Sequence, residues 1–186
     1  PVIVETKFIL NLWLGQVPDY TVKFIRLMLC ICIIDAMANP FMTAAAATGN
    51  VKVYQLIVGG ILLLIVPVSY MALYMGYAPE SVFIAHLIIA LIAFIVRLFI
   101  ICRMIGMSIH IYAKKVIIPS LIIGFISLSM TLSAKLMIPH GILYSILIIF
   151  SAIIIIGALS YYIGLSLNEK MFIRNKILQI RSIAKR

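Results

Sequence analysis

Charged side chains are scarce in this sequence, and acidic ones are the scarcest. Asp, Glu, Lys and Arg make up 11% of the 186 residues, whereas a soluble domain has about 25%. Apolar residues make up 65% of the chain, and the mean hydropathy is +1.24. A water-soluble fold of this length could not bury so much apolar surface. We therefore expect the lipid bilayer to act as the solvent for most of the chain.

Patterns typical of catalysis or metal binding are also missing. His86, His110 and His140 fall in different connectors or helix ends, so no pair has metal-ligand spacing. Cys30 and Cys32 form a C-x-C pair, but positions two apart do not face each other on a helix. No Ser-His-Asp set, P-loop or G-x-G-x-x-G is recognisable. The sequence thus predicts no enzyme, no metal site and no cofactor.

Five long apolar runs predict an all-α, polytopic helix bundle, because a span needs about 20 apolar residues and lipid leaves no partner for an open backbone. We expect an outer linker at 1–23, a transmembrane bundle at 24–167 and a cytoplasmic tail at 168–186. The five expected spans are 24–47, 54–75, 82–101, 116–138 and 142–167. Glycine and proline mark three of the connectors, and the fourth, at 102–115, is longer and basic.

Lysine and arginine are spread unevenly over the two sides of this topology. Eleven of the 15 fall on one side and four on the other. The larger group is Lys52, Arg97, Arg103, Lys114, Lys115, Lys170, Arg174, Lys176, Arg181, Lys185 and Arg186, and the smaller group is Lys7, Lys23, Arg26 and Lys135. Because cytoplasmic segments carry the excess of basic residues, we expect Pro1 to lie outside and Arg186 inside.

Asp35, near the middle of the first expected span, is the strongest functional signal. Asn39 and Thr43 follow at four-residue intervals, so the three share one helix face. A carboxylate at the bilayer centre costs about 2.5–3.5 kcal/mol on insertion scales. Pro40 should kink this helix or free a backbone carbonyl. The face is typical of a water-filled cavity, which makes these three residues substrate-cavity candidates, although a hydrogen-bonded contact between helices would explain them too.

Three basic residues are candidates for binding a phosphate or a lipid headgroup. Lys23 and Arg26 are three apart on one helix face and could form a fork of donors, or they could simply anchor the helix at the interface. Arg97 lies inside the third expected span, near its inner end. Arg103, Lys114 and Lys115 cluster beyond it. This basic cluster could attract an anionic headgroup, or it could serve only to fix the topology.

The tail at 168–186 has the pattern of an amphipathic helix. Ile173, Ile177 and Ile180 fall on one face, and basic residues fall on the other. Such a helix lies on an anionic membrane surface, so membrane lipids are expected partners. Because the basic excess follows the pattern of the spans, we expect no nucleic acid partner.

Several segments of the sequence resemble the C-terminal part of bacterial polysaccharide flippases, the O-antigen and capsule exporters of the multidrug/oligosaccharidyl-lipid/polysaccharide superfamily. The matching segments are Leu12–Thr21 (LWLGQVPDYT), Phe24–Leu27, Asp35–Ala36, Asn39–Pro40, Thr43–Ala45, Ala47–Asn50 and Tyr54–Gln55. The resemblance covers most of the chain and is densest over Leu12–Tyr54. These motifs mark a family and are not catalytic.

The resemblance implies an alternating-access transporter of about 12–14 helices in two lobes. The chain, which begins at Pro1 without a recognisable signal peptide, would be a C-terminal part of it, and the missing N-terminal lobe would complete the cavity. The implied substrate is a polyprenyl-pyrophosphate-linked oligosaccharide, a repeat unit for O-antigen, capsule or other lipopolysaccharide biosynthesis. The implied location is the bacterial cytoplasmic (inner) membrane.

Three other functions are compatible with the sequence. A multidrug cation exporter of the same superfamily would have a similar fold. A membrane-embedded glycosyl- or acyltransferase would need acid and base groups gathered at one interface, and none is apparent. A purely structural membrane subunit would need no polar cavity.

Overall fold

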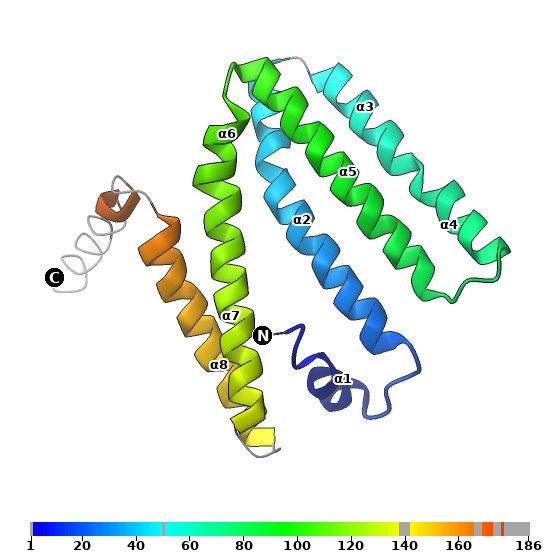
Figure 1. Ribbon diagram of the computed structural model, residues 1–186, viewed down its shortest axis with the longest axis vertical. Coiled ribbons are helices and arrows are strands. Elements are labelled where there is room, and N and C mark those ends of the chain that lie inside the picture. The colour runs from blue at the N-terminus through cyan, green and yellow to red at the C-terminus, as the bar shows by residue number, and fades with distance from the viewer. Residues whose placement is uncertain (1, 50, 138–141, 166–168, 173–175, 177–186) are drawn as a thin grey trace, which may run out of the picture. The chain divides into compact units, whose positions relative to one another are not determined.

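The computed structural model describes residues 2–49, 51–137, 142–165, 169–172 and 176, and this part of the chain is helical apart from its turns (Figure 1). The predicted all-α fold is therefore confirmed. The chain divides into two compact units, Val2–Tyr112 and a second unit that begins at Ala113. Each unit is described by itself below.

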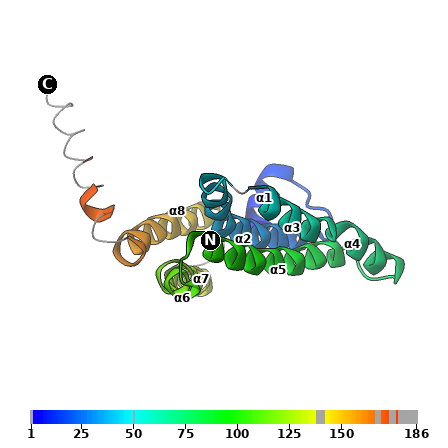
Figure 2. The same cartoon turned by 90° about the horizontal axis from the view of Figure 1, so that it is seen from above.

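In the first unit, helix α5 contacts all the other long helices (Figures 1 and 2). The helices of this unit are α1 (Thr6–Leu14), α2 (Thr21–Ala47), α3 (Val51–Leu63), α4 (Ile65–Tyr74), α5 (Glu80–Ile105) and α6 (Ile109–Tyr112). The most extensive packing joins α2 to α5, and α3 and α4 pack on α5 as well. Helix α1 lies in the segment expected to be a linker, and its presence was not foreseen.

Two local features shape the helices around α5. The apolar run from Val51 to Tyr74 breaks at Leu64, because Pro67 has no N–H to bond the carbonyl of Leu63. Helix α5 ends at Gly106, which has a φ of 66° and donates its N–H to the carbonyl of Cys102. Glycine adopts this left-handed conformation without steric cost, so the chain can turn there and start α6.

In the second unit, two long helices form an antiparallel pair with a π-helical segment on each. The elements are η1 (Ala113–Ile117), α7 (Ile118–Met137), α8 (Ile142–Leu159) and η2 (Ser160–Gly164). Ser127 and Thr131 are buried, and the Thr131 hydroxyl donates to the Ser127 carbonyl at 2.6 Å. A Cβ added at Gly164 would lie 3.7 Å from the Cδ1 of Ile123, an ordinary van der Waals contact, so η2 packs beside α7 at this point.

Four of the described helices are long and apolar enough to cross a membrane. They are Val51–Tyr74, Glu80–Ile105, Ile109–Ala134 and Ile146–Gly164. They correspond to the second to fifth expected spans, so the structure supports a multi-pass membrane protein.

The first expected span, at 24–47, is not among these four. It is a continuous helix, α2, that runs through Pro40 without interruption. Asp35, Asn39 and Pro40 make its middle less apolar than the other long helices. Its membrane crossing remains a prediction.

Two other expectations differ from the structure or lie outside it. The long connector expected at 102–115 is a short turn, because α5 continues to Ile105 and the chain is helical again from Ile109. Lys114 and Lys115 therefore lie in the π-helical segment η1. Most of the expected amphipathic tail, at 173–175 and 177–186, lies outside the described residues.

Candidate functional site

Helix α2 has one face that is packed against the rest of the first unit. Ile31, Ala38, Phe41 and Ala45 on this face are buried. The Phe41 ring lies 5.8 Å from the Phe94 ring of α5 and 5.0 Å from the Tyr112 ring of α6. The Tyr112 hydroxyl also donates to the carbonyl of Met37 at 3.3 Å. These contacts fix the rotation of α2 about its own axis.

A neighbouring, exposed face of α2 carries the three cavity candidates. Asp35, Asn39 and Thr43 are all exposed and follow one another on successive turns. None of the three has a hydrogen bond or ion pair to another residue that the structure describes. Within the described chain, therefore, the carboxylate, the amide and the hydroxyl are all left to an outside partner.

The free face of α5 has a different character. Its exposed residues are bulky and apolar, and they recur at helical spacing: Ile84, Ile88, Leu91, Ile92, Ile95 and Phe99. A surface of this kind suits contact with lipid tails. The first unit therefore has a lipid-compatible face on α5 and a polar face on α2.

Two contacts fix the depth of the polar face. The rings of Phe24 and Phe83 stack at 4.9 Å near the start of α2 and α5, and Phe41 meets Phe94 further along both helices. Asp35 lies between these contacts along α2. It is therefore level with the apolar middle of α5, which is one of the four candidate spans.

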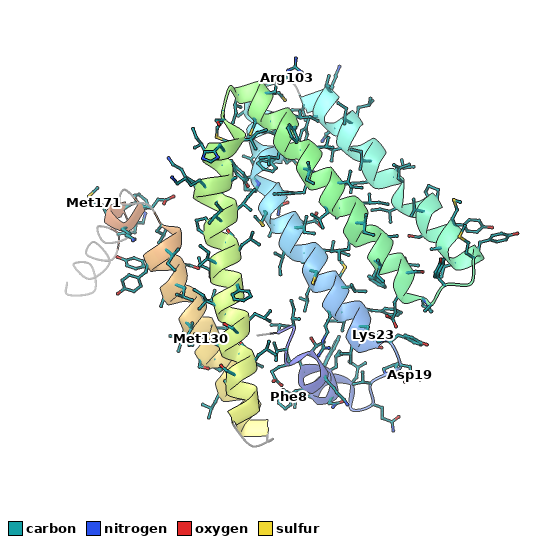
Figure 3. The ribbon with its side chains drawn as sticks, in the orientation of Figure 1. Phe8, Asp19, Lys23, Arg103, Met130 and Met171 are labelled. Carbon is teal, nitrogen blue, oxygen red and sulfur yellow. The ribbon has the colours of Figure 1, made fainter. Side chains whose placement is uncertain are left out.

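Lys23 and Arg26 both bind groups within the chain. The Lys23 Nζ lies 2.6 Å from the Glu80 Oε1, and the Arg26 Nε donates to the Ile3 carbonyl at 3.1 Å. The hydrogen bond to Glu80 and the negative charge of its carboxylate raise the pKa of Lys23 above 10.5. Figure 3 shows Lys23 and Asp19 at one end of the first unit and Arg103 at the opposite end. An anion at Lys23 would have to compete with Glu80.

Arg97, the third phosphate candidate, lies on α5 close to Tyr54 of α3. The Tyr54 side chain is buried, and its hydroxyl lies within electrostatic range of the Arg97 guanidinium. The Arg97 Nε is buried and has no hydrogen-bond partner among the residues the structure describes. An unpaired buried donor is costly, so this guanidinium is a position where an added acceptor would be stabilising.

The sequence places Arg103 in a basic cluster, but it does not show that His110 borders the same hollow at the turn between α5 and α6. Arg103 and His110 line an open hollow there together with apolar residues. The hollow depends on α5 stopping at Gly106 and on α6 starting directly afterwards. A glycine four residues before His110 was the only local signal in the sequence.

The described residues contain no group of three or more His, Cys, Asp or Glu that could hold a metal ion. Cys30, Cys32 and Cys102 are free thiols, half-buried, exposed and buried respectively. Comparisons of the chain with protein-family models, with curated proteins and with solved structures found no match.

Proposed function

We propose that this chain is part of a transporter that moves a lipid-linked oligosaccharide across the bacterial cytoplasmic membrane by alternating access. One observation carries the proposal. A carboxylate, an amide and a hydroxyl occupy an exposed face of α2 at the depth of an apolar span, and no described residue satisfies them. Lipid tails cannot solvate such groups, whereas a water-filled cavity can.

The chemistry of this face suits a sugar. Asn39 and Thr43 offer neutral donors and acceptors, and sugar hydroxyls bind groups of that kind. Asp35 can accept hydrogen bonds from two hydroxyls at once. The lipid tail of the substrate would remain against an apolar surface such as that of α5 while the head group passes through the polar cavity. The sequence resemblance to polysaccharide flippases, which includes these same three residues, also supports this substrate class.

The share of each span that the chain itself buries also supports a larger assembly. Between 11% and 28% of the residues in the most apolar stretch of each span are buried inside the chain. The remaining surface needs cover from lipid and from other protein surfaces. A second lobe facing α2 would enclose the polar face as a cavity.

Asp35 itself favours a second candidate function, the export of organic cations. An unpaired carboxylate at mid-depth attracts positive charge in a low-dielectric setting. Such an exporter would use the same face but would protect cells from cationic drugs and would not restore polysaccharide export.

The test uses cysteine accessibility and export together. In a background without native cysteines, Asp35→Cys and Asn39→Cys should react in native membranes with a small polar thiol reagent. Ile88→Cys and Ile92→Cys, on the free face of α5, are matched controls and should stay unreactive because thiolates do not form in lipid. Asp35→Asn should insert normally and lower polysaccharide export about tenfold or more, as loss of a charge-assisted substrate contact would.

The outcomes separate the alternatives. Unreactive cysteines at 35 and 39, combined with normal export by Asp35→Asn, would rule out the cavity. Reactive cysteines with unchanged export but lost resistance to cationic drugs would assign the cavity to the second candidate function.

A further inference from the structure

The acidic residues leave one end of the first unit without any negative charge. The chain has five of them, and four belong to this unit: Glu5, Asp19, Asp35 and Glu80. Glu80 starts α5 and is paired with Lys23, and Asp19 lies at the same end (Figure 3). Glu5 directly precedes α1, next to the Ile3 carbonyl that Arg26 binds near the start of α2. Asp35 is in the middle of α2. The end that holds Arg103 and His110 therefore has no carboxylate of its own to neutralise it.

The turn between α5 and α6 forms a hollow of about 620 Å³ at this end. Arg103 and His110 line it, and both side chains are exposed. Neither has a hydrogen bond or ion pair to another described residue. Two basic donors thus border one hollow, and neither side chain is bonded to another described residue.

Apart from Ser108, the other side chains that line the hollow are apolar or weakly polar. Phe99, Ile100 and Met107 line it beside the two basic residues, and the Phe99 side chain is 58% exposed. Phe99 belongs to the free face of α5 that carries only bulky apolar residues. A small soluble anion would gain nothing from this wall, whereas an acyl chain would.

We propose that this hollow binds one anionic phospholipid, with its phosphate against Arg103 and His110 and its upper acyl chain against Phe99. Guanidinium and imidazole N–H groups are suited to phosphate oxygens. The hollow lies at the end of a candidate span, which is where headgroups lie, and the cation count assigns this end to the cytoplasmic leaflet, whose lipids are often anionic. The inference does not depend on what the protein transports.

Photo-crosslinking in the intact protein tests the site directly. p-Benzoylphenylalanine replaces Phe99, and the protein is reconstituted in vesicles of equal phosphatidylglycerol and phosphatidylcholine. After illumination, the mass of the protein identifies the lipid attached. Phosphatidylglycerol should be captured about fivefold more than phosphatidylcholine, which is roughly the factor that one basic residue near an anionic surface supplies. Leu91 lies on the same exposed face of α5, eight residues before Phe99. The same probe at Leu91 should capture both lipids equally.

Charge variants show whether the preference belongs to this hollow. Arg103→Gln with His110→Gln should abolish the preference at Phe99, whereas Lys52→Gln removes a cation from the start of α3 and should leave it intact. An equal loss with Lys52→Gln would mean general surface attraction and would overturn the proposal. So would equal capture of the two lipids in the unmodified background.

A final arm distinguishes the lipid from a soluble anion. Inorganic phosphate should leave the preference unchanged relative to chloride at the same ionic strength. A preference that phosphate removes and chloride does not would assign the two donors to a soluble phosphate and overturn the lipid site.

Discussion

The basic side chains of the first unit differ in whether the chain itself satisfies them. Lys23 is paired with Glu80, and Arg26 donates to a backbone carbonyl. Arg103 has no described partner, and the Arg97 Nε has none. Lys23 and Arg26 therefore join α2 to its neighbours, whereas Arg103 and Arg97 have N–H donors without a described acceptor. The expectation that Lys23 and Arg26 bind phosphate remains a prediction, and it now requires displacement of these partners.

The Lys23–Glu80 pair gives a pH prediction with a definite sign. The pKa of Lys23 is raised above its ordinary 10.5, mainly by the hydrogen bond to Glu80. Stability from a raised lysine pKa is fully present below the unfolded value and is lost as the pH rises through the folded value. Alkaline pH above 10.5 should therefore lower the thermal unfolding midpoint in detergent, in part through this pair.

Two lysine variants isolate that contribution. Lys23→Met should show a smaller drop in unfolding midpoint above this pH than the unmodified protein, because its pair is already absent. Lys52→Met removes a lysine for which the structure gives no partner, and it should behave like the unmodified protein. The difference should be small, because exposed ion pairs contribute little. Identical pH curves for Lys23→Met and the unmodified protein would contradict the prediction.

At the scale of the helices, long apolar runs were sufficient to predict four spans. Their apolar character is continuous and needs no knowledge of packing. The break at Leu64 was not predicted, although Pro67 carried the signal, because a proline in a membrane helix is often tolerated. The short turn at Gly106 was missed because the polar residues after it suggested a longer connector. From Ile109 onward these residues are helical nonetheless, and Tyr112 of α6 packs against Phe41.

The candidate site was only partly predictable. The spacing of Asp35, Asn39 and Thr43 places them on one helix face whatever the fold. Which face of α2 is packed could not be deduced, because both faces contain apolar residues. The contacts of Phe41 with Phe94 and Tyr112 decide it, and they join segments far apart in the sequence.

Phe41 should therefore be the residue on which the orientation of α2 depends. It is 2% exposed, and Phe41→Ala would leave a cavity between α2, α5 and α6. In soluble cores such a change costs about 3–5 kcal/mol. We expect a smaller cost here, about 1–3 kcal/mol, because lipid supplies little hydrophobic driving force between helices. Unfolding of the purified protein by titration with a denaturing detergent measures it.

The neighbouring residue is a matched control. Met42 is 56% exposed, so Met42→Ala should change the unfolding free energy by no more than about 0.5 kcal/mol, the usual range for a surface change. Equal effects of the two substitutions would mean that α2 is not held by its Phe41 face. In that case Asp35 would also have no fixed direction.

At the scale of the whole molecule, the orientation in the membrane decides which side of the bilayer each end of the first unit faces. The cation count predicts that the Lys23–Glu80 end faces outside and the Arg103 end faces inside. Helix α5 connects the two ends with 26 residues, or about 39 Å at 1.5 Å per residue, which exceeds the roughly 30 Å of a hydrocarbon core. If α5 spans the bilayer, residues just beyond its two ends must face opposite compartments.

Two single cysteines test this orientation in a background without native cysteines. Tyr77 lies exposed in the turn before α5, and Ser108 lies exposed in the turn after it. Tyr77→Cys should react with an impermeant thiol reagent added to spheroplasts, and Ser108→Cys should react only after lysis, because the excess of basic residues predicts that this end lies in the cytoplasm. The reverse pattern would invert the topology and move the hollow at Arg103 to the outer leaflet. Reaction of both cysteines in sealed spheroplasts would mean that α5 does not cross the membrane, and the depth assigned to Asp35 would be lost with it.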